Sequence, residues 1–300
     1  MKQCPKCNNI DQSGTIRFCA SCGTEMFFLS RFEKTDKNQS ILTLFFSGTG
    51  NTKYIAQIFS EKIGAECHSI EEDLNFTDAI IKHETIAFCY PIYGSRVPLI
   101  MREFVGRYME PLKGKKLAIL VTQAMFSGDG ARVLCDLFPK DYIDVVYAEH
   151  FLMPNNIGNF FVSAKSGQSI KKCLDKAVAR VETVVQNMKH GIVKKRGFST
   201  ISILLGKVQG VSWQGDSKCP HALPKTMEYR AKRSVKFDSD CTACGACVLS
   251  CPMKNLKCEN GVMSHMNNCT ACYRCVNICP HRAITAFIKS KPKWQYKEFI

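Results

Sequence analysis

The chain has 300 residues, of which 45% are hydrophobic, and this is enough for two domains with cores of their own. Its 18 cysteines would fit a secreted disulfide framework, but residues 1–7 contain no apolar signal segment and no run approaches membrane-spanning length. We therefore expect a cytoplasmic protein with reduced cysteines. The formal net charge of +15 is partly local, because residues 189–236 hold eleven Lys and Arg against two acids, which argues against nucleic acid as the main partner.

Residues 1–30 contain two C-x-x-C turns separated by eleven residues. Each turn offers two thiolates, so together they make a closed tetrahedral site that suits zinc, or iron as in a rubredoxin. The short separation and Gly23 after the second turn resemble a small zinc ribbon, in which the metal has a structural role. Residues 31–40 are polar and predict a linker. The predicted metal ligands are Cys4, Cys7, Cys19 and Cys22.

An apolar run at 41–46 predicts a strand that is buried on both faces of a parallel sheet. Residues 51–63 then change to helical periodicity. The loop between them, SGTGNT, brings hydroxyls, glycines and backbone N–H groups to the positive end of a helix, which is typical of a phosphate-binding loop. Its residues, all candidates for cofactor binding, are Ser47, Gly48, Thr49, Gly50, Asn51 and Thr52.

Other interpretations of this loop stay open. The P-loop pattern G-x-x-x-x-G-K-[ST] is absent, and the dinucleotide fingerprint would need a third glycine where Lys53 stands. Glu71 lies about twenty residues further on, so NAD remains an alternative. A glycine-rich strand-to-helix turn without any ligand is another.

The rest of the first 190 residues alternates between strand and helix signals. Strands are predicted at 66–72, 85–90, 116–122 and 141–151, and helices at 97–109 and 164–189, the last ended by Gly191. Five strands alternating with helices predict an α/β fold with a doubly wound parallel sheet. Ligands of such sheets bind where the strand order reverses, beyond the carboxyl ends of the strands.

The loops after the first, third and fourth predicted strands, SGTGNT, YPIYGS and TQAMFSGDG, resemble the three that meet around the cofactor of flavodoxins. The resemblance covers residues 41–190 and implies an FMN-binding, flavodoxin-like domain whose first loop holds the FMN phosphate. Tyr93 is the candidate for stacking on the flavin ring, with Tyr90 and Phe126 behind it, and Asp129 could contact a ring edge. For these side chains a role in the core or loop fits equally well. The remaining candidate contacts are Gly94, Gln123, Gly128 and Gly130.

Residues 191–234 are basic, with an apolar, glycine-containing stretch at 197–213 that is too short to span a bilayer. We expect it to pack as a docking segment between domains; a weak membrane-surface element is the alternative.

Two copies of one cysteine pattern follow, CTACGACVLSCP and CTACYRCVNICP, with two, two and three residues between the cysteines. This is the bacterial pattern for 4Fe-4S clusters, in which the fourth Cys of each run ligates the other cluster. Zinc or disulfides are alternatives that the duplicated order, with a proline after each run, disfavours. The predicted ligands are Cys241, Cys244, Cys247 and Cys279 for one cluster, and Cys269, Cys272, Cys275 and Cys251 for the other.

Asn260-Gly261, between the two runs, predicts a hairpin turn. Residues 235–288 closely resemble the two-cluster ferredoxin domain of bacteria, an α+β unit, and leave 289–300 as a basic tail. The whole chain resembles the flavodoxin-ferredoxin fusion proteins of anaerobic bacteria and archaea, with a zinc ribbon added at its start. This resemblance implies electron transfer, and it implies no particular substrate.

With two clusters, a zinc ion and a flavin phosphate bound, roughly eight charges would be subtracted, leaving about +7. The remaining basic surface could steer an acidic redox partner protein. Two other functions stay open. One is a flavin-dependent reductase of a small acceptor, and the other is a redox- or metal-responsive binding module that uses the zinc ribbon and the basic segment on nucleic acid.

Overall fold

The computed structural model describes residues 2–3, 10–11, 21, 27–28, 40–158, 167–216, 218 and 223–297. The chain divides into two compact units, Met1–Asn38 and Gln39–Ile300. In the first unit, β1 (Lys2–Gln3), β2 (Ile10–Asp11) and β3 (Phe27–Phe28) form an antiparallel sheet in the order β2-β1-β3. The predicted ligands Cys4, Cys7, Cys19 and Cys22 lie outside the described residues, so the zinc ribbon stays a prediction.

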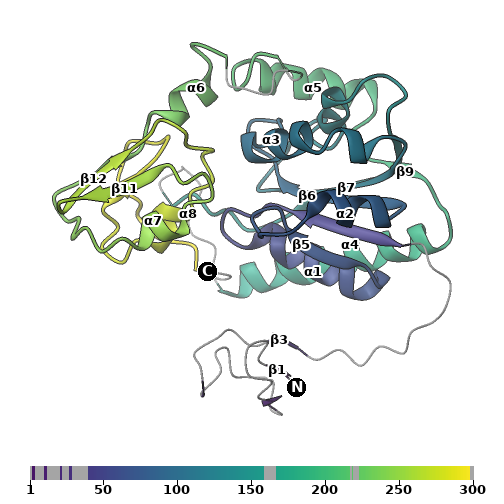
Figure 1. Ribbon diagram of the computed structural model, residues 1–300, viewed down its shortest axis with the longest axis horizontal. Helices are drawn as coiled ribbons and strands as arrows, with labels where there is room; N and C mark the ends of the chain where they lie inside the picture. The colour runs from purple at the N-terminus through teal and green to yellow at the C-terminus, as the bar shows by residue number, and fades with distance from the viewer. Residues whose placement is uncertain are drawn as a thin grey trace. The chain divides into compact units, whose positions relative to one another are not determined.

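The second unit is built on a parallel sheet in the order β5-β4-β6-β7-β8-β9 (Figure 1). Five of its strands match the predicted ones. The sixth, β9, has two lysines that pair with Tyr147 and Ala148 and was not predicted, because so short and charged a segment carries no strand signal. The strands are β4 (Ile41–Phe45), β5 (Glu66–Ser69), β6 (Thr85–Pro91), β7 (Lys116–Gln123), β8 (Asp144–Leu152) and β9 (Lys194–Lys195).

Helices cover both faces of this sheet (Figure 1). On one face α1 (Asn51–Ile63) and α4 (Gly167–Lys189) bury side chains such as Phe59 and Val181 against the strands. On the other face α2 (Phe76–Lys82) and α3 (Leu99–Arg107) contribute Ile80 and Met101 to a second core. Two 3-10 turns, Glu110–Leu112 and Arg132–Leu137, complete the connections.

The helix boundaries follow local signals. The chain enters α1 through Gly50 with φ of 95° and leaves it through Gly64 with φ of 81°, so the predicted bounds of this helix are confirmed. Helix α2 was not predicted, and it begins at Asn75, whose side chain accepts the Asp78 N–H at 3.3 Å. Helix α4 is observed from residue 167, and residues 164–166 of the predicted helix lie outside the described residues.

Residues 191–234 form α5 (Thr200–Val211) and α6 (Met227–Lys232) besides β9. Helix α5 turns its two glycines, Gly206 and Gly210, toward the sheet domain. Helix α6 places Glu228 in a buried ion pair with Arg102 of α3, at 2.8 Å. The segment therefore packs against the sheet domain, although the outer side of α5 is apolar and 43–70% exposed, through Ile201, Leu204, Leu205, Val208 and Val211.

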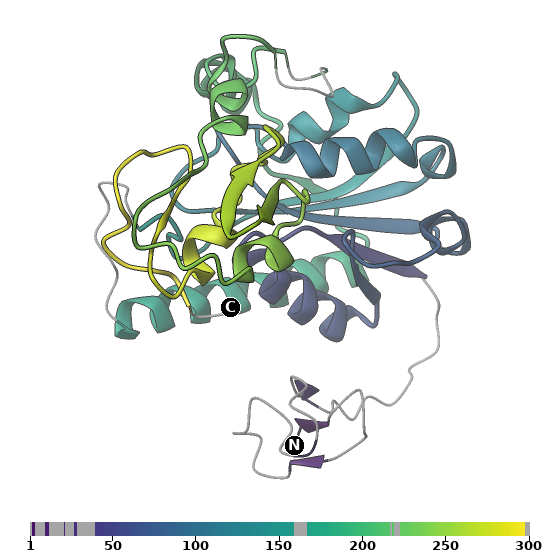
Figure 2. The ribbon, with the colours of Figure 1, turned by 60° about the vertical axis from the view of Figure 1, so that its left-hand side comes forward.

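The C-terminal region consists of two short helices, α7 (Ala246–Ser250) and α8 (Arg274–Ile278), and two antiparallel strand pairs. Strand β10 (Lys236–Phe237) pairs with β13 (Ile284–Thr285), and β11 (Leu256–Glu259) with β12 (Val262–His265). The hairpin prediction is confirmed, since Asn260 and Gly261 have φ of 50° and 75°. Figure 2 brings this region forward, in front of one end of the sheet strands.

Within the described ranges, no helix combines the length and the apolar character needed to cross a membrane.

Candidate redox site

Each predicted set of four cysteines surrounds a cavity. Three cysteines of each cavity come from one run, and the fourth comes from the other run. The first cavity is lined by Cys241, Cys244, Cys247 and Cys279, and the second by Cys251, Cys269, Cys272 and Cys275. The fold therefore brings together the two sets that the spacing indicated, while their role as cluster ligands stays a prediction.

The two runs share their backbone geometry as well as their sequence. Ala243 and its counterpart 28 positions later, Ala271, have φ of 53° and 57°. The next related pair, Gly245 and Tyr273, has φ of 77° and 59°. Left-handed backbone at a residue with a side chain costs about 1–2 kcal/mol, so its recurrence shows that both runs need the same sharp turns to aim their thiols inward.

Burial favours the protonated thiol at three of these cysteines. It raises the pKa of Cys247 and Cys272 to about 11 each, and that of Cys269 to about 12. Only a nearby metal cation would make these thiols ionise at neutral pH. In the described part of the chain no three Cys, His, Asp or Glu side chains are close enough to hold a single ion. None of the thirteen described cysteines is in a disulfide.

The predicted phosphate loop, residues 47–52, lies between the end of β4 and the start of α1. Gly50 donates its N–H to Ser47 Oγ at 3.0 Å, and Thr52 Oγ1 lies 2.7 Å from Thr122 Oγ1 at the end of β7. The first turn of any helix has N–H groups without partners inside the helix. This loop therefore meets the electrostatic requirement for binding an anion.

Two side chains of the loop hold neighbouring segments. Asn51 donates to Pro154 O at 2.9 Å and accepts the Tyr296 hydroxyl at 2.7 Å. Thr49 accepts the Asn156 amide at 2.8 Å. Backbone N–H groups and the Ser47 hydroxyl, rather than these two side chains, are thus the groups that an anion would meet.

The loops after β6 and β7 reach the same end of the sheet as the phosphate loop. Tyr93 contacts this loop, because a Cβ on Gly48 would lie 3.2 Å from its hydroxyl. The hydroxyl is buried and has no hydrogen-bond partner among the described residues. Tyr90, in contrast, is fully buried in the core and donates to Gly130 O at 3.0 Å. Of the two roles that the sequence left open for Tyr90, the structure shows the one in the core.

Two glycines predicted to approach a flavin closely instead approach protein. A Cβ on Gly94 would lie 2.6 Å from the Trp213 ring, and one on Gly128 would lie 2.5 Å from the Gly206 nitrogen in α5. Gly130 is close to Ile92 in the same way, at 2.0 Å. A flavin ring has no space on these faces of the three glycines, because Trp213 and α5 cover Gly94 and Gly128, and Ile92 of the loop after β6 covers Gly130.

Three further candidates of the loop after β7 differ in exposure. Asp129 is buried and paired with Arg132 at 2.7 Å, so it has no access to a ring edge. Gln123 accepts a hydrogen bond from Ser127 and donates to Met125 O at 3.2 Å, which closes its own loop. Phe126 is 54% exposed and is free to cover a ligand.

Arg274 joins the second cysteine run to the phosphate loop. Its guanidinium donates to Ser47 O at 2.6 Å and Gly48 O at 3.0 Å, and forms two hydrogen bonds with Glu71, at 2.6 and 2.7 Å. A Cβ on Gly48 would lie only 2.5 Å from the Cys272 carbonyl oxygen. The second cavity is thus the one in contact with the phosphate loop.

Arg274 was not predicted as a site residue, although the sequence holds a signal for it. The two runs differ at the two positions before the third cysteine, where the first has Gly245-Ala246 and the second has Tyr273-Arg274. Only the second copy of the motif has a cation at this position, and this difference indicates a contact that the first copy does not make.

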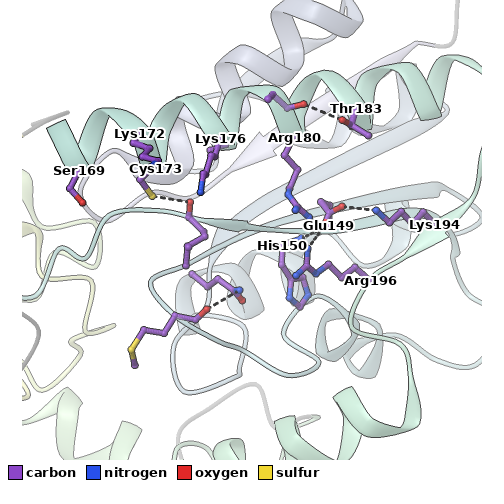
Figure 3. A pocket seen from close by; sticks show the side chains of 15 residues that line it. Glu149, His150, Ser169, Lys172, Cys173, Lys176, Arg180, Thr183, Lys194 and Arg196 are labelled. Atoms are coloured by element: carbon purple, nitrogen blue, oxygen red, sulfur yellow. Dashed lines mark hydrogen bonds and ion pairs between the residues drawn. The ribbon is translucent and has the colours of Figure 1, made fainter. Parts of the chain in front are cut away.

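A larger cavity, of about 770 Å³, opens beside β8 and α4, away from both sets of cysteines (Figure 3). Its lining includes Glu149 and His150 of β8, both buried, together with Arg196. Gln123, the last residue of β7, lines it too.

Comparisons with known proteins agree with this architecture. A family model described as a flavodoxin domain matches residues 42–160, and one described as a 4Fe-4S binding domain matches residues 264–285. No curated protein is found to match the chain.

Solved structures similar to the chain include the Megasphaera elsdenii flavodoxin, with 19% identity, 47% of this chain and 98% of that chain covered, and a TM-score of 0.31. General stress protein 14 of Treponema denticola, in complex with FMN, has 11% identity, coverage of 50% and 99%, and a TM-score of 0.37. A flavodoxin from the domain Archaea has 16% identity, coverage of 48% and 98%, and a TM-score of 0.32. From the strand order and the family matches, residues 42–160 form a flavodoxin-like domain, and a 4Fe-4S binding domain follows it at 264–285.

Proposed function

We propose that this protein is an iron-sulfur flavoprotein that transfers electrons between FMN and two 4Fe-4S clusters. The observation that carries the proposal is the contact between the phosphate loop and the second cysteine-lined cavity, through Gly48 and Cys272. Electron transfer needs its redox groups close together, and the contact between the two candidate sites supports such a transfer.

The residues present fit FMN at one end of the sheet. The loop 47–52 would hold the phosphate, and the buried Tyr93 hydroxyl beside Gly48 lacks a partner that a bound group would provide. Phe126, at the exposed tip of the loop after β7, would cover the ring. FMN, when bound, supplies the ability to exchange electrons either in pairs or singly.

The donor chemistry of the two cavities fits 4Fe-4S clusters. Each offers four thiols, and the second also contains the Thr270 hydroxyl, which is buried without a partner in the described part of the chain. Each cluster supplies one-electron chemistry at a low potential. A zinc ion on Cys4, Cys7, Cys19 and Cys22 and an acidic partner protein complete the proposal.

Cofactor content is the direct test. We would purify the full chain anaerobically, record its absorbance spectrum, release the flavin with acid, and count iron, sulfide and zinc. We expect about eight iron, about eight sulfide, one FMN and one zinc per chain. A count of eight iron atoms per chain without flavin would indicate a ferredoxin region beside a flavodoxin-like domain that binds no FMN. That result would refute electron transfer between FMN and the clusters.

A matched pair of variants tests the ligand assignment. Cys272→Ser should lose about half of the iron, because one cavity loses a thiolate. Cys258→Ser is the control, since Cys258 lies in the same region, is exposed and lines neither cavity. Iron counts and electron paramagnetic resonance after reduction would report the result, and equal spectra for Cys272→Ser and the parent protein would refute the assignment.

A further inference from the structure

The cavity beside β8 and α4 is strongly basic (Figure 3). Four separate segments build its wall: the loop after β7, β8, α4 and the stretch that begins with β9. Among the described residues, Glu149 alone lines it with a carboxylate. The basic side chains of the lining are Lys172, Lys176, Arg180, Lys194 and Arg196. The cavity thus has four more positive than negative charges, in a volume of about 770 Å³ that is typical of small-molecule sites.

Glu149 does not neutralise this charge. Its carboxylate is 1% exposed and lies 3.3 Å from Arg180, 3.2 Å from Lys194 and 3.1 Å from Arg196. Burial by itself would raise its pKa, but the His150 N–H and the neighbouring cations keep the pKa below its usual value. One ionised carboxylate among three cations leaves an excess of two positive charges at this point.

His150 adds no charge to the cavity at neutral pH. Burial, followed by the nearby Arg196, lowers its pKa to about 4. Its Nε2 accepts the Ala131 N–H at 3.3 Å, which requires that nitrogen to be unprotonated. Its Nδ1 lies 3.1 Å from the Ser127 hydroxyl, to which it donates in this tautomer.

Lys172 and Lys176 form no ion pair or hydrogen bond with any described residue, although both line the cavity. Figure 3 shows Lys176 and Arg180 reaching from α4 toward β8. Lys171, on the same helix, is different, since it pairs with Asp175 at 2.9 Å and does not line the cavity. Two unpaired ammonium groups therefore face the space that the Glu149 cluster already makes positive.

Part of the cavity lining is apolar. Met125 and Leu152 contribute to it and are 63% and 48% exposed, so they offer apolar surface to a ligand. We propose that this cavity binds a phosphorylated small molecule of nucleotide size, with its phosphates on Lys172, Lys176, Arg180 and Arg196 and its ring on Met125 and Leu152. Guanidinium groups offer paired donors that match phosphate oxygens.

Calorimetric titration of the holoprotein with ADP, inorganic pyrophosphate and citrate tests this inference, which is independent of the electron-transfer proposal. We expect saturable binding of ADP and pyrophosphate that weakens as salt is added, and a lower affinity for citrate. Lys172→Ala and Lys176→Ala should each raise the dissociation constant about fivefold or more, because each removes a charge-assisted contact. Both lysines are exposed, so folding should be unaffected.

Lys171→Ala is the matched control, with the same loss of charge one position away, and should leave the affinity within about twofold. If Lys171→Ala lost as much affinity for ADP as Lys172→Ala and Lys176→Ala, the proposed site would be refuted, because binding would then depend on net charge alone. If citrate bound as tightly as pyrophosphate, the proposed preference for phosphorylated ligands would be refuted. Absence of saturable ADP binding at millimolar concentration would overturn the proposal as a whole.

Discussion

At the scale of single residues, Arg274 has the most concentrated set of contacts. Its five N–H groups make five hydrogen bonds, two to Glu71 and three to the carbonyls of Ser47, Gly48 and Ser250. Lysine has three donors around a point charge and cannot reproduce this planar arrangement. The connection between the cysteine runs and the phosphate loop therefore depends on arginine in particular.

We expect Arg274→Lys to lower the free energy of unfolding by about 2 kcal/mol, since the ion pair with Glu71 is only one-fifth to one-quarter exposed. Urea titration of the holoprotein would measure it. Lys257→Ala is the control, because the ion pair of Lys257 with Glu259 is 45% and 67% exposed and should contribute less than about 1 kcal/mol. Equal midpoints for parent and Arg274→Lys would contradict the expectation.

His150 gives a prediction about pH. Its pKa is lowered from 6.5 to about 4 in the folded chain, so the unfolded chain takes up a proton first as the pH falls. Stability should therefore decrease between pH 6.5 and pH 4, by about 3 kcal/mol from this group alone. His150→Asn should have a flatter profile over that interval in denaturant titrations.

The exposed His190 provides the control for this pH profile. His190→Asn should keep the parent's slope, because it removes an exposed side chain and leaves the buried His150 in place. A parent-like slope in His150→Asn would show instead that other groups cause the acid sensitivity.

The sequence was informative about thiols and less so about flavin contacts. The spacing of the cysteines indicates which of them share a cavity. Cys251 and Cys279, the fourth cysteine of each run, could therefore each be assigned to the set formed by the other run without any tertiary information. Tyr90 and Asp129 looked equally available in the sequence, yet both are buried. Their surroundings are set by elements that are remote in sequence, which local patterns do not encode.

At the scale of elements, α5 depends on two glycines. A Cβ on Gly206 would lie 1.7 Å from the Asp129 carboxylate, and one on Gly210 would lie 2.4 Å from the Arg96 guanidinium. Both neighbours are buried, so neither has room to move away. The helix therefore packs through its smallest residues and presents its aliphatic ones outward.

We expect Gly206→Ala to destabilise the protein by about 2 kcal/mol, because α5 must move off the loop after β7. Hydrogen exchange should then increase in α5 before the rest of the chain. Gly106→Ala, on α3, is the control, because the added methyl group would have no neighbouring atom within 4 Å. The higher helix propensity of alanine should raise the free energy of unfolding by up to about 1 kcal/mol. Similar stabilities for the two variants would argue against the close packing of α5.

Strands were easier to predict than the later helices for a physical reason. A strand that is covered on both faces, such as β4, must be continuously apolar, so its sequence is unambiguous. Helix α5 reverses the usual arrangement, since its apolar side faces outward. Helix α6 has six residues and is anchored by the charged Glu228, so it has little periodicity to detect.

Across the second unit as a whole, bound metal should matter more for the stability of the C-terminal region than for that of the parallel sheet with its helices. The C-terminal core is small and includes the thiols of Cys247, Cys275 and Cys279, whereas the two cores of the sheet include only Cys272 of the eight predicted ligands. A region of about fifty residues has too little apolar surface to fold well alone. Bound clusters would provide the missing stability.

Removal of iron with a chelator under oxidising conditions should therefore unfold residues 235–288 and leave the sheet folded. Hydrogen exchange followed by mass spectrometry would show fast exchange in α7, α8 and β10–β13, with β4, β6 and β7 still protected. Unchanged protection in the C-terminal region after iron loss would show that its apolar core is sufficient.

The buried pair of Arg102 and Glu228 has a consequence for how this chain can be divided. A carboxylate that lies outside the flavodoxin-like domain neutralises a cation inside it, and α5 covers two of the domain's loops. A fragment that stops at residue 190 would expose a guanidinium, a tyrosine hydroxyl and a glycine-lined surface that the full chain conceals. A cut after residue 190 would therefore leave each part with surface that the full chain buries.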